Sequence, residues 1–258
     1  MSLNAAPEKT VLPPSALSCR GVGKSYNGEN VLFDVDLDVP AGDFAALTGL
    51  SGAGKSTLFR ILAGMEAPDG GKVFLNGEDV TGTQGLCGCM TQKDALFDHF
   101  SVLDNVALPL RIKKQNRREA RDEARPFLRR FGLGDCENKY PFEISGGMRQ
   151  RAALLRTFMC QKKTVLLDEP FSALDAITRN NIHEWYKEAS VSFSLSTFCI
   201  THDIDEAIKL ADRIYVIGGK PGKIKKMFLI PRRGEEASFL ESKEAFALKR
   251  EICRELEA

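Results

Sequence analysis

Apolar residues in this chain fall into short runs, separated by stretches in which apolar positions recur at helical spacing. Three runs of this kind alternate with helical segments, which is typical of a mainly parallel sheet. They cover residues 164–168, 197–201 and 213–217. A further run, 44–48, precedes a helix predicted over 56–63. Residues 31–39 alternate toward their end and predict a half-buried antiparallel strand, and 72–77 predict a strand that enters a turn. The pattern predicts an α/β fold.

Charge divides the helical segments into two kinds. The stretch 95–134 is helix-forming and heavily charged, and within it 111–130 holds nine Lys and Arg residues against three acidic ones. Such a stretch can bind nucleic acid or anionic lipid, but acidic residues are interspersed, which favours a solvated helix face. The tail is different, because 242–257 carries apolar residues on one face and predicts an amphipathic helix packed on the body. Those residues are Ala245, Leu248, Ile252 and Leu256.

Composition sets limits on location and partners. The chain has 258 residues, 43% of them hydrophobic, and a net charge of +1, so no global charge argues for nucleic acid. Its apolar runs are far shorter than the ~20 residues that cross a bilayer. Residues 1–16 lack the apolar core of a signal peptide, so we expect a flexible leader on a cytosolic chain.

The seven cysteines form no C-x-x-C pair, and the chain has only three histidines. Reduced and mostly buried thiols are therefore expected, rather than a disulfide scaffold or a zinc site. Cys87-Gly88-Cys89 is the one close pair, for which a redox or metal role is the alternative.

Residues 49–57 form the most informative motif, because they fit the phosphate-loop pattern G-x-x-x-x-G-K-[ST] between a strand and a helix. Backbone N–H groups and the helix N-terminus would wrap the phosphates of a nucleotide. Lys55 would reach the β- and γ-phosphates, and the Ser56 hydroxyl would coordinate Mg²⁺. The predicted nucleotide-binding residues of the loop are Gly49, Ser51, Gly52, Ala53, Gly54, Lys55, Ser56 and Thr57.

A second Gly-Lys-Ser, at residues 23–25, lacks this context. Ser18 stands where the first glycine belongs, and a turn over 27–30 follows instead of a helix. We therefore expect no second nucleotide site there.

Two further segments suit ATP chemistry. An apolar strand ends in Asp168 and Glu169, which suit Mg²⁺ coordination and a general base that polarises water. The segment 145–151, Ser-Gly-Gly-Met-Arg-Gln-Arg, opens a helix and forms a second anion-binding N-terminus. One nucleotide has no use for both helix ends in one chain, so the second is expected to face the nucleotide of a partner subunit.

With these motifs the sequence resembles the ATP-binding subunits of ABC transporters from about residue 17 to 222. The resemblance implies a P-loop NTPase (RecA-like) core with a mainly parallel sheet, an antiparallel β subdomain and an inserted helical subdomain. The expected division is a leader (1–16), the β subdomain with the first part of the core (17–94), the helical subdomain with the signature motif (95–150), the second part of the core (151–222) and a C-terminal strand and helix extension (223–258).

The resemblance also implies roles for residues outside the loop. Tyr26 would stack on adenine, Glu169 and His202 would be catalytic, and Asp175 would belong to the loop that crosses the dimer interface. The implied Mg²⁺ ligands are Ser56, Gln92 and Asp168, with Gln92 also linking the nucleotide to a membrane subunit. The residues implied to face the partner's ATP are Ser145, Gly146, Gly147 and Gln150. The signature departs from its commonest form at Ile144 and Met148.

Segments 92–97, 101–106 and 220–224 resemble, more narrowly, the importer group for nitrate, sulfonate and taurine, although 98–100 lacks that group's usual Pro-Trp pair. The chain is thus expected to form an ATP-dependent homodimer with Mg²⁺ at the cytoplasmic face of the cell membrane. Its implied partners are integral membrane permease subunits and an extracytoplasmic substrate-binding protein, without nucleic acid. The alternatives are a soluble ABC-type ATPase that acts on nucleic acid or ribosomes, and an exporter ATPase. No feature identifies the cargo.

Overall fold

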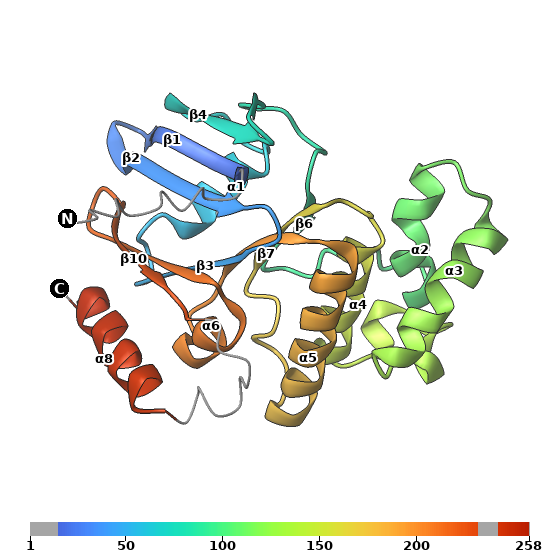
Figure 1. Ribbon diagram of the computed structural model, residues 1–258. Coiled ribbons are helices and arrows are strands. Elements are labelled where there is room, and N and C mark those ends of the chain that lie inside the picture. Colours follow the sequence, from blue (N-terminus) through green and yellow to red (C-terminus); the bar gives the residue numbers. More distant parts are fainter. Residues whose placement is uncertain (1–14, 232–241, 258) are drawn as a thin grey trace, which may run out of the picture.

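The computed structural model describes residues 15–231 and 242–257, and its centre is a six-stranded sheet in the order β10-β9-β3-β8-β7-β6 (Figure 1). β3 pairs in parallel with β8 and β9, and β7 pairs in parallel with β8 and β6. β10, at the edge of this sheet, runs antiparallel to β9. The mainly parallel core sheet is thereby confirmed. Its strands are β3 (Phe44–Gly49), β6 (Gly88–Met90), β7 (Thr164–Asp168), β8 (Ser196–Ile200), β9 (Arg213–Gly218) and β10 (Lys223–Leu229).

Alternate residues of the central strands enter two different hydrophobic cores. In β3, Phe44 and Ala46 join the core that is shared with the helical part of the chain. Ala45 and Leu47 join the second core, beneath the antiparallel sheet. Successive side chains of a strand point to opposite faces, so a strand covered on both faces is apolar throughout. This explains why the core strands are continuous apolar runs in the sequence.

The second sheet is antiparallel, has the strand order β2-β1-β4-β5 and lies above the core sheet, with α1 between them (Figure 1). It confirms the strands predicted over 31–39 and 72–77. β1 begins at Ser15, so Ser15 and Ala16 belong to this sheet and not to the predicted leader, whose other residues lie outside the described ranges. These elements are β1 (Ser15–Tyr26), β2 (Glu29–Pro40), α1 (Lys55–Leu62), β4 (Gly70–Leu75) and β5 (Glu78–Asp79).

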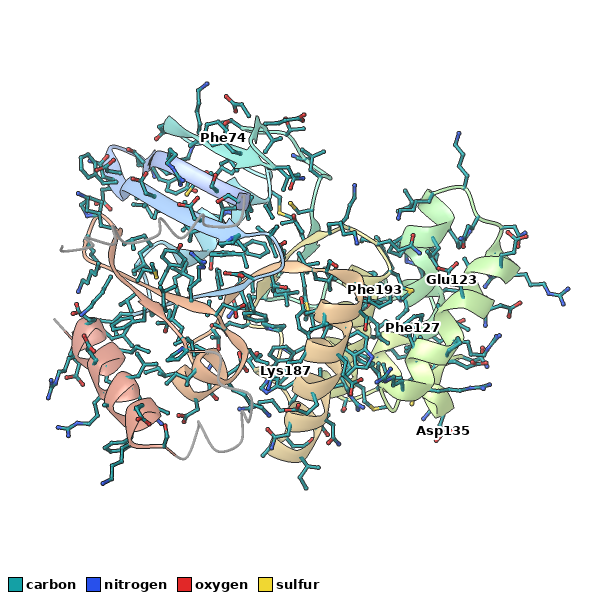
Figure 2. The ribbon with its side chains drawn as sticks, viewed as in Figure 1. Phe74, Glu123, Phe127, Asp135, Lys187 and Phe193 are labelled. Atoms are coloured by element: carbon teal, nitrogen blue, oxygen red, sulfur yellow. The ribbon has the colours of Figure 1, made fainter. Side chains whose placement is uncertain are left out.

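A group of helices on the other side of the molecule confirms the helical character of 95–134 (Figure 1). Aromatic contacts attach this group to α5 (Ala176–Phe193) through Phe158. Its ring lies 5.6 Å from that of Phe127 within the group and 5.1 Å from that of Phe193 in α5, between centroids. Figure 2 shows Phe127 and Phe193 on facing sides of that boundary. The group comprises α2 (Val102–Ile112), α3 (Arg117–Arg130), the short 3-10 turns η1 (Gly134–Cys136) and η2 (Pro141–Glu143), and α4 (Gly146–Phe158).

The basic residues of α3 bind carboxylates of the same chain. Arg117 and Arg121 both contact Asp104, whose side chain is buried, at 2.8 and 3.2 Å. Arg125 binds Glu137 at 2.9 Å. Part of the positive charge on this helix is therefore neutralised within the molecule, which agrees with a solvated helix face.

The remaining helices are α5 (Ala176–Phe193), α6 (Ile204–Leu210) and α8 (Lys243–Glu257). The amphipathic tail is confirmed, because Ala245 and Ile252 of α8 are buried where the helix packs on α6 and β9. Part of the predicted extension, 232–241 and 258, lies outside the described residues. Over the ranges that the structure covers, no helix has both the length and the apolar character needed to cross a membrane.

Candidate nucleotide site

The phosphate loop joins β3 to α1 and depends on two glycines. A Cβ on Gly49 would lie 2.5 Å from the carbonyl oxygen of Ile217 in β9, so only glycine lets the two strands approach this closely. Gly54 has φ +89°, and its Cβ would lie 2.6 Å from Leu32. Gly54 has a left-handed backbone conformation and lies directly against β2, so there is no room for a side chain at this position. The sequence motif therefore coincides with a loop compressed against two strands.

The loop presents cationic and N–H groups together. The N-cap of α1 is Gly54, which has no side chain to cap the helix and leaves its first N–H groups available to an anion. The Lys55 ammonium donates to the carbonyl oxygens of Gly49 and Leu50 at 2.7 and 2.9 Å, and burial lowers its pKa. The side chain thus spans the mouth of the loop, where it can exchange these carbonyl contacts for phosphate oxygens.

Three segments converge on the carboxylate of Glu169 at the carboxyl end of the parallel strands. His202, after β8, has Nδ1 3.3 Å from Glu169 Oε1, and Gln92, after β6, donates from Nε2 to Glu169 Oε2 at 3.4 Å. Glu169 itself follows the last residue of β7 and has φ +51°. The structure thus brings these three predicted site residues together around one carboxylate.

Asp168, the last residue of β7, is buried beside that group. Burial, followed by repulsion from Glu169, raises the pKa of Asp168 to about 6, although Lys55 acts in the opposite direction. A buried carboxylate beside a second, partly exposed one is a site that favours a cation.

These residues fit Mg²⁺, which prefers oxygen ligands and keeps several waters. Asp168 supplies a buried carboxylate, and Ser56 exposes its hydroxyl at the start of α1. Within 15–231 and 242–257, no group of three or more His, Cys, Asp or Glu residues could hold a metal ion. The protein would supply Asp168 and Ser56 as ligands, and phosphate and water the remainder. When bound, the ion would neutralise charge on the phosphates.

The segment 145–151 begins α4 with an exposed, capped end. Ser145 is the N-cap, and its Oγ accepts from the N–H of Met148 at 3.3 Å. A Cβ on Gly146 would meet nothing within 4 Å, whereas one on Gly147 would lie 3.1 Å from the carbonyl oxygen of Ala173. Gly146 therefore faces open space, and Gly147 packs against the chain itself.

The two helix N-termini belong to different parts of the fold. α1 packs against β2, β3 and β7, while α4 packs against α2, α3 and β6 (Figure 1). The two helix ends are thus held by different elements, and that each meets a different nucleotide stays a prediction.

The Gln150 side chain does not lie where the sequence predicted it. The side chain is buried and donates to the carbonyl oxygen of Glu169 at 2.8 Å and to Ser172 Oγ at 3.1 Å. It also accepts from the N–H of Ala173 at 2.8 Å. This geometry contradicts the expectation that Gln150 faces the ATP of a partner subunit, because the amide is used within its own chain.

Two other predicted residues have local partners. The Tyr26 hydroxyl, at the end of β1, donates to Glu66 and accepts from Arg60. Asp175 caps the N-terminus of α5, accepting from the N–H of Thr178 at 3.0 Å.

The second Gly-Lys-Ser segment lies inside the antiparallel strand β1, which is followed by the strand β2 and not by a helix. Lys24 donates to Asp69 and to the carbonyl oxygen of Ala67. The expectation that this segment forms no nucleotide site agrees with its position.

Gly88 and Cys89 of the Cys-Gly-Cys segment lie in the short edge strand β6 and Cys87 directly precedes it; the sequence did not reveal this strand. Burial raises the pKa of Cys87 to about 11 and of Cys89 to about 12, so both thiols stay protonated at neutral pH. Their position supports the structural interpretation over a redox or metal role.

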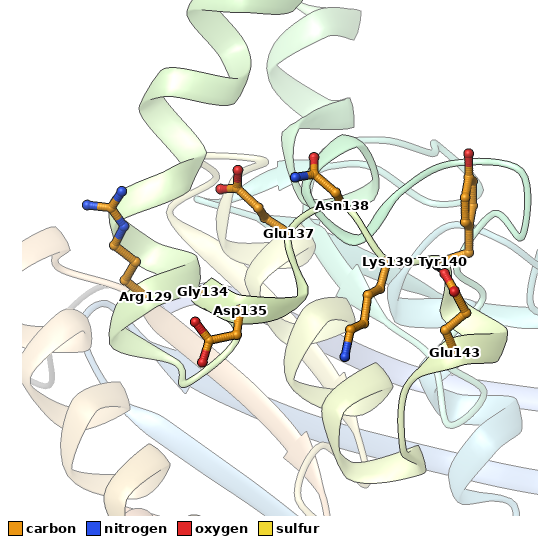
Figure 3. Close-up of a pocket in the computed structure, with 8 residues that line it drawn as sticks. All are labelled: Arg129, Gly134, Asp135, Glu137, Asn138, Lys139, Tyr140 and Glu143. Atoms are coloured by element: carbon orange, nitrogen blue, oxygen red, sulfur yellow. Dashed lines mark hydrogen bonds between the residues drawn. The ribbon is translucent and has the colours of Figure 1, made fainter.

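A polar pocket of about 740 Å³ lies in the helical subdomain, between the end of α3 and η2 (Figure 3). Its lining residues are Arg129, Gly134, Asp135, Glu137, Asn138, Lys139, Tyr140 and Glu143. None of them belongs to the phosphate loop, β7 or β8, so this pocket is separate from the site described above.

Comparison with known proteins identifies relatives of this chain. A model of the family "ABC transporter" matches residues 32–172. The sulfate/thiosulfate import ATP-binding protein CysA of Pseudomonas syringae pv. tomato is 39% identical over 223 residues, which cover 81% of this chain and 68% of that protein. The nitrate import ATP-binding protein NrtD of Synechocystis sp. is 37% identical over 205 residues, which cover 80% of this chain and 77% of that protein.

Other relatives extend the match in length and in three dimensions. An ABC transporter ATP-binding protein of Methanocaldococcus jannaschii is 38% identical over 244 residues, 90% of each chain. The solved dimeric structure of MJ0796, a bacterial ABC transporter cassette, superposes with a TM-score of 0.77 at 26% identity. It covers 84% of this chain and 100% of that one, and a further structure of this cassette is a post-hydrolysis state bound to ADP and phosphate.

Proposed function

Because the chain belongs to the ABC transporter family, we propose that it is the ATP-hydrolysing subunit of an importer, acting as a homodimer at the cytoplasmic face of the cell membrane. Its fold is that of an ABC ATPase cassette, and its activity is that of an ATPase. The observation that carries the detailed proposal is the convergence of Glu169, His202 and Gln92 on the edge of the sheet where β3 enters the phosphate loop.

In the proposed reaction the loop binds the nucleotide and Glu169 activates water. Lys55 and the N-terminus of α1 bind the phosphates. Glu169 accepts a proton from the attacking water as general base. His202 holds the Glu169 carboxylate on one side and Gln92 on the other, which fixes the direction in which the water is polarised.

The proposed dimer places Ser145 and Gly146 of one subunit over the ATP of the other. The exposed end of α4 supports this arrangement, as does the likeness to a dimeric cassette. ATP bound between two surfaces favours the closed pair, and the loss of γ-phosphate contacts reopens it, since a ligand shifts a conformational equilibrium only by its differential affinity.

The dimer is tested with Glu169→Gln, which keeps the shape of the side chain but cannot take up a proton. We expect turnover to fall by ~10²-fold or more while ATP still binds. The variant with ATP should run as a dimer in size-exclusion chromatography. Adding Ser145→Arg should break this dimer, whereas Ser192→Arg, on an exposed face of α5, should not.

A persistent dimer in the Glu169→Gln, Ser145→Arg variant would show that the signature helix does not face the partner's nucleotide. Near-normal turnover by Glu169→Gln would remove Glu169 from the catalytic role.

Permease subunits are proposed to dock on the segment that follows Gln92. Phe97 is 45% exposed and packs with His99 and Phe100, with ring centroids 4.6 to 5.9 Å apart. Buried Asn105 holds this loop by accepting from the N–H of Phe97 and donating to three carbonyl oxygens. An exposed aromatic cluster on a loop fixed from below suits an apolar partner surface.

Cysteine crosslinking in native membranes tests this surface. Phe97→Cys should crosslink to an integral membrane subunit, and Arg118→Cys, whose native side chain is 93% exposed on α3, should not. Crosslinking from Arg118→Cys alone would place the docking surface elsewhere. Two of the relatives, CysA and NrtD, are named for the import of sulfate or thiosulfate and of nitrate, so these oxyanions are the first cargo to assay with the co-purified permease and binding protein.

A further inference from the structure

Gln150 joins the helix that begins at Ser145 to the loop that carries Glu169. Gln150 lies five positions after Ser145, in the first turns of α4, and the residue is 6% exposed. The amide makes three hydrogen bonds of 2.8 to 3.1 Å, all to the segment from Glu169 to Ala173. An amide that is buried and fully paired holds its partners in a defined geometry.

The accepting carbonyl belongs to Glu169 itself. With φ +51°, this residue has a backbone conformation that L-residues adopt only when surrounding contacts impose it. The Glu169 N–H donates to Ile200, and its carbonyl accepts from Gln150 and from Ser172 Oγ. The direction of the Glu169 carboxylate is therefore set partly from α4.

We propose that Gln150 is a positioning residue, which transmits a movement of the signature helix to Glu169 of the same chain and so couples the two ATP sites of the dimer. The inference rests on the proposed function, in which Ser145 meets the partner's ATP and Glu169 activates water. A helix moves as a rigid element over so short a span, so a displacement at Ser145 also displaces the Gln150 amide.

The test measures kcat, KM and the Kd for ATP in three variants. Gln150→Met keeps the volume and removes all three hydrogen bonds, and we expect kcat to fall about 10- to 100-fold through misplacement of Glu169. The Kd should stay within about threefold, because none of these hydrogen bonds reaches residues 49–57. Exposed Ser172→Ala removes the hydroxyl that accepts from Gln150 and donates to the Glu169 carbonyl oxygen, without disturbing the core. We expect a loss of about two- to fivefold.

Thr157→Val is the matched control. Thr157 is buried in the same helix and bonds to the carbonyl oxygens of Ala153 and Cys89, away from Glu169. Thr157→Val should change kcat by less than about twofold, since substitutions at sites that share no partners act independently. An equal fall of kcat in Thr157→Val would assign the effect to general loosening of α4 and overturn the proposal.

A double-mutant cycle with Glu169→Gln decides whether Gln150 acts through Glu169. If it does, Gln150→Met or Ser172→Ala causes no further loss in the Glu169→Gln background. If the kcat losses of the two single variants instead multiply in the double variant, Gln150 does not act through Glu169. That outcome, or a raised Kd with kcat retained, would overturn the inference while leaving the catalytic role of Glu169 intact. Near-normal turnover by Glu169→Gln alone would overturn that role, and this inference with it.

Discussion

The carboxylate of Asp168 should make the nucleotide-free protein less stable than an amide would. Burial and Glu169 raise the pKa of Asp168 from 3.8 to about 6. Each pKa unit corresponds to about 1.4 kcal/mol, so a shift of roughly two units costs the ionised folded state about 3 kcal/mol. Because the pKa is raised on folding, this cost is absent below pH 3.8. It grows between pH 3.8 and about 6 and is complete above that pH.

Urea unfolding of wild type and Asp168→Asn, without nucleotide and with EDTA, measures this cost from pH 3.5 to 8. At pH 8 the variant should be more stable by up to about 3 kcal/mol, and the two proteins should converge toward pH 3.5. ATP turnover should fall in the same variant, because the cation loses a carboxylate ligand.

Asp79→Asn is the control, because the pKa of Asp79 is shifted in the opposite direction from that of Asp168. Hydrogen bonds from Lys72 and Thr81 lower the pKa of this surface carboxylate to about 2, so its loss should bring no stabilisation at any pH. An Asp168→Asn variant that is less stable than wild type at pH 8, or a difference that does not vary with pH, would refute the reasoning.

Three further predictions concern the loop, its support and the tail. Lys55→Ala should weaken ATP binding about 10- to 100-fold in a fluorescent-nucleotide titration, while Lys24→Ala, in the second Gly-Lys-Ser, should not. Unchanged affinity in folded Lys55→Ala would misplace the site. A Cβ on Gly222 would lie 2.2 Å from the carbonyl oxygen of Ala53 in the phosphate loop. Gly222→Ala should therefore cost about 1–3 kcal/mol and weaken ATP binding, unlike Gly70→Ala, where a Cβ meets open space. Equal stability and affinity of these two variants would contradict that contact. Ile252→Ala, in the core beneath α8, should cost about 2–5 kcal/mol in urea unfolding, and a loss below 1 kcal/mol would argue that the tail packs loosely.

Each part of the site that could be predicted is a short segment whose own sequence contains the signal. The phosphate loop needs glycines and a lysine at fixed spacing between a strand and a helix, and all of these are local properties. Asp168 and His202 were predicted to end strands for the same reason, since apolar runs of this length with flanking polar residues are typical of buried parallel strands. Parallel strands bring their carboxyl ends to one edge, which is why residues more than a hundred positions apart could be expected together.

The sequence by itself thus determined the fold class, the phosphate loop and the polar residues at the strand ends, because each depends on backbone conformation and periodicity over a few residues. Only the tertiary structure decided which way Gln150 points, that Gly222 supports the phosphate loop and that Gly88 and Cys89 lie in an edge strand. The physical reason is that a buried side chain takes its partners from segments packed against it. Those partners lie from about 20 to nearly 170 positions away, so no local pattern records them.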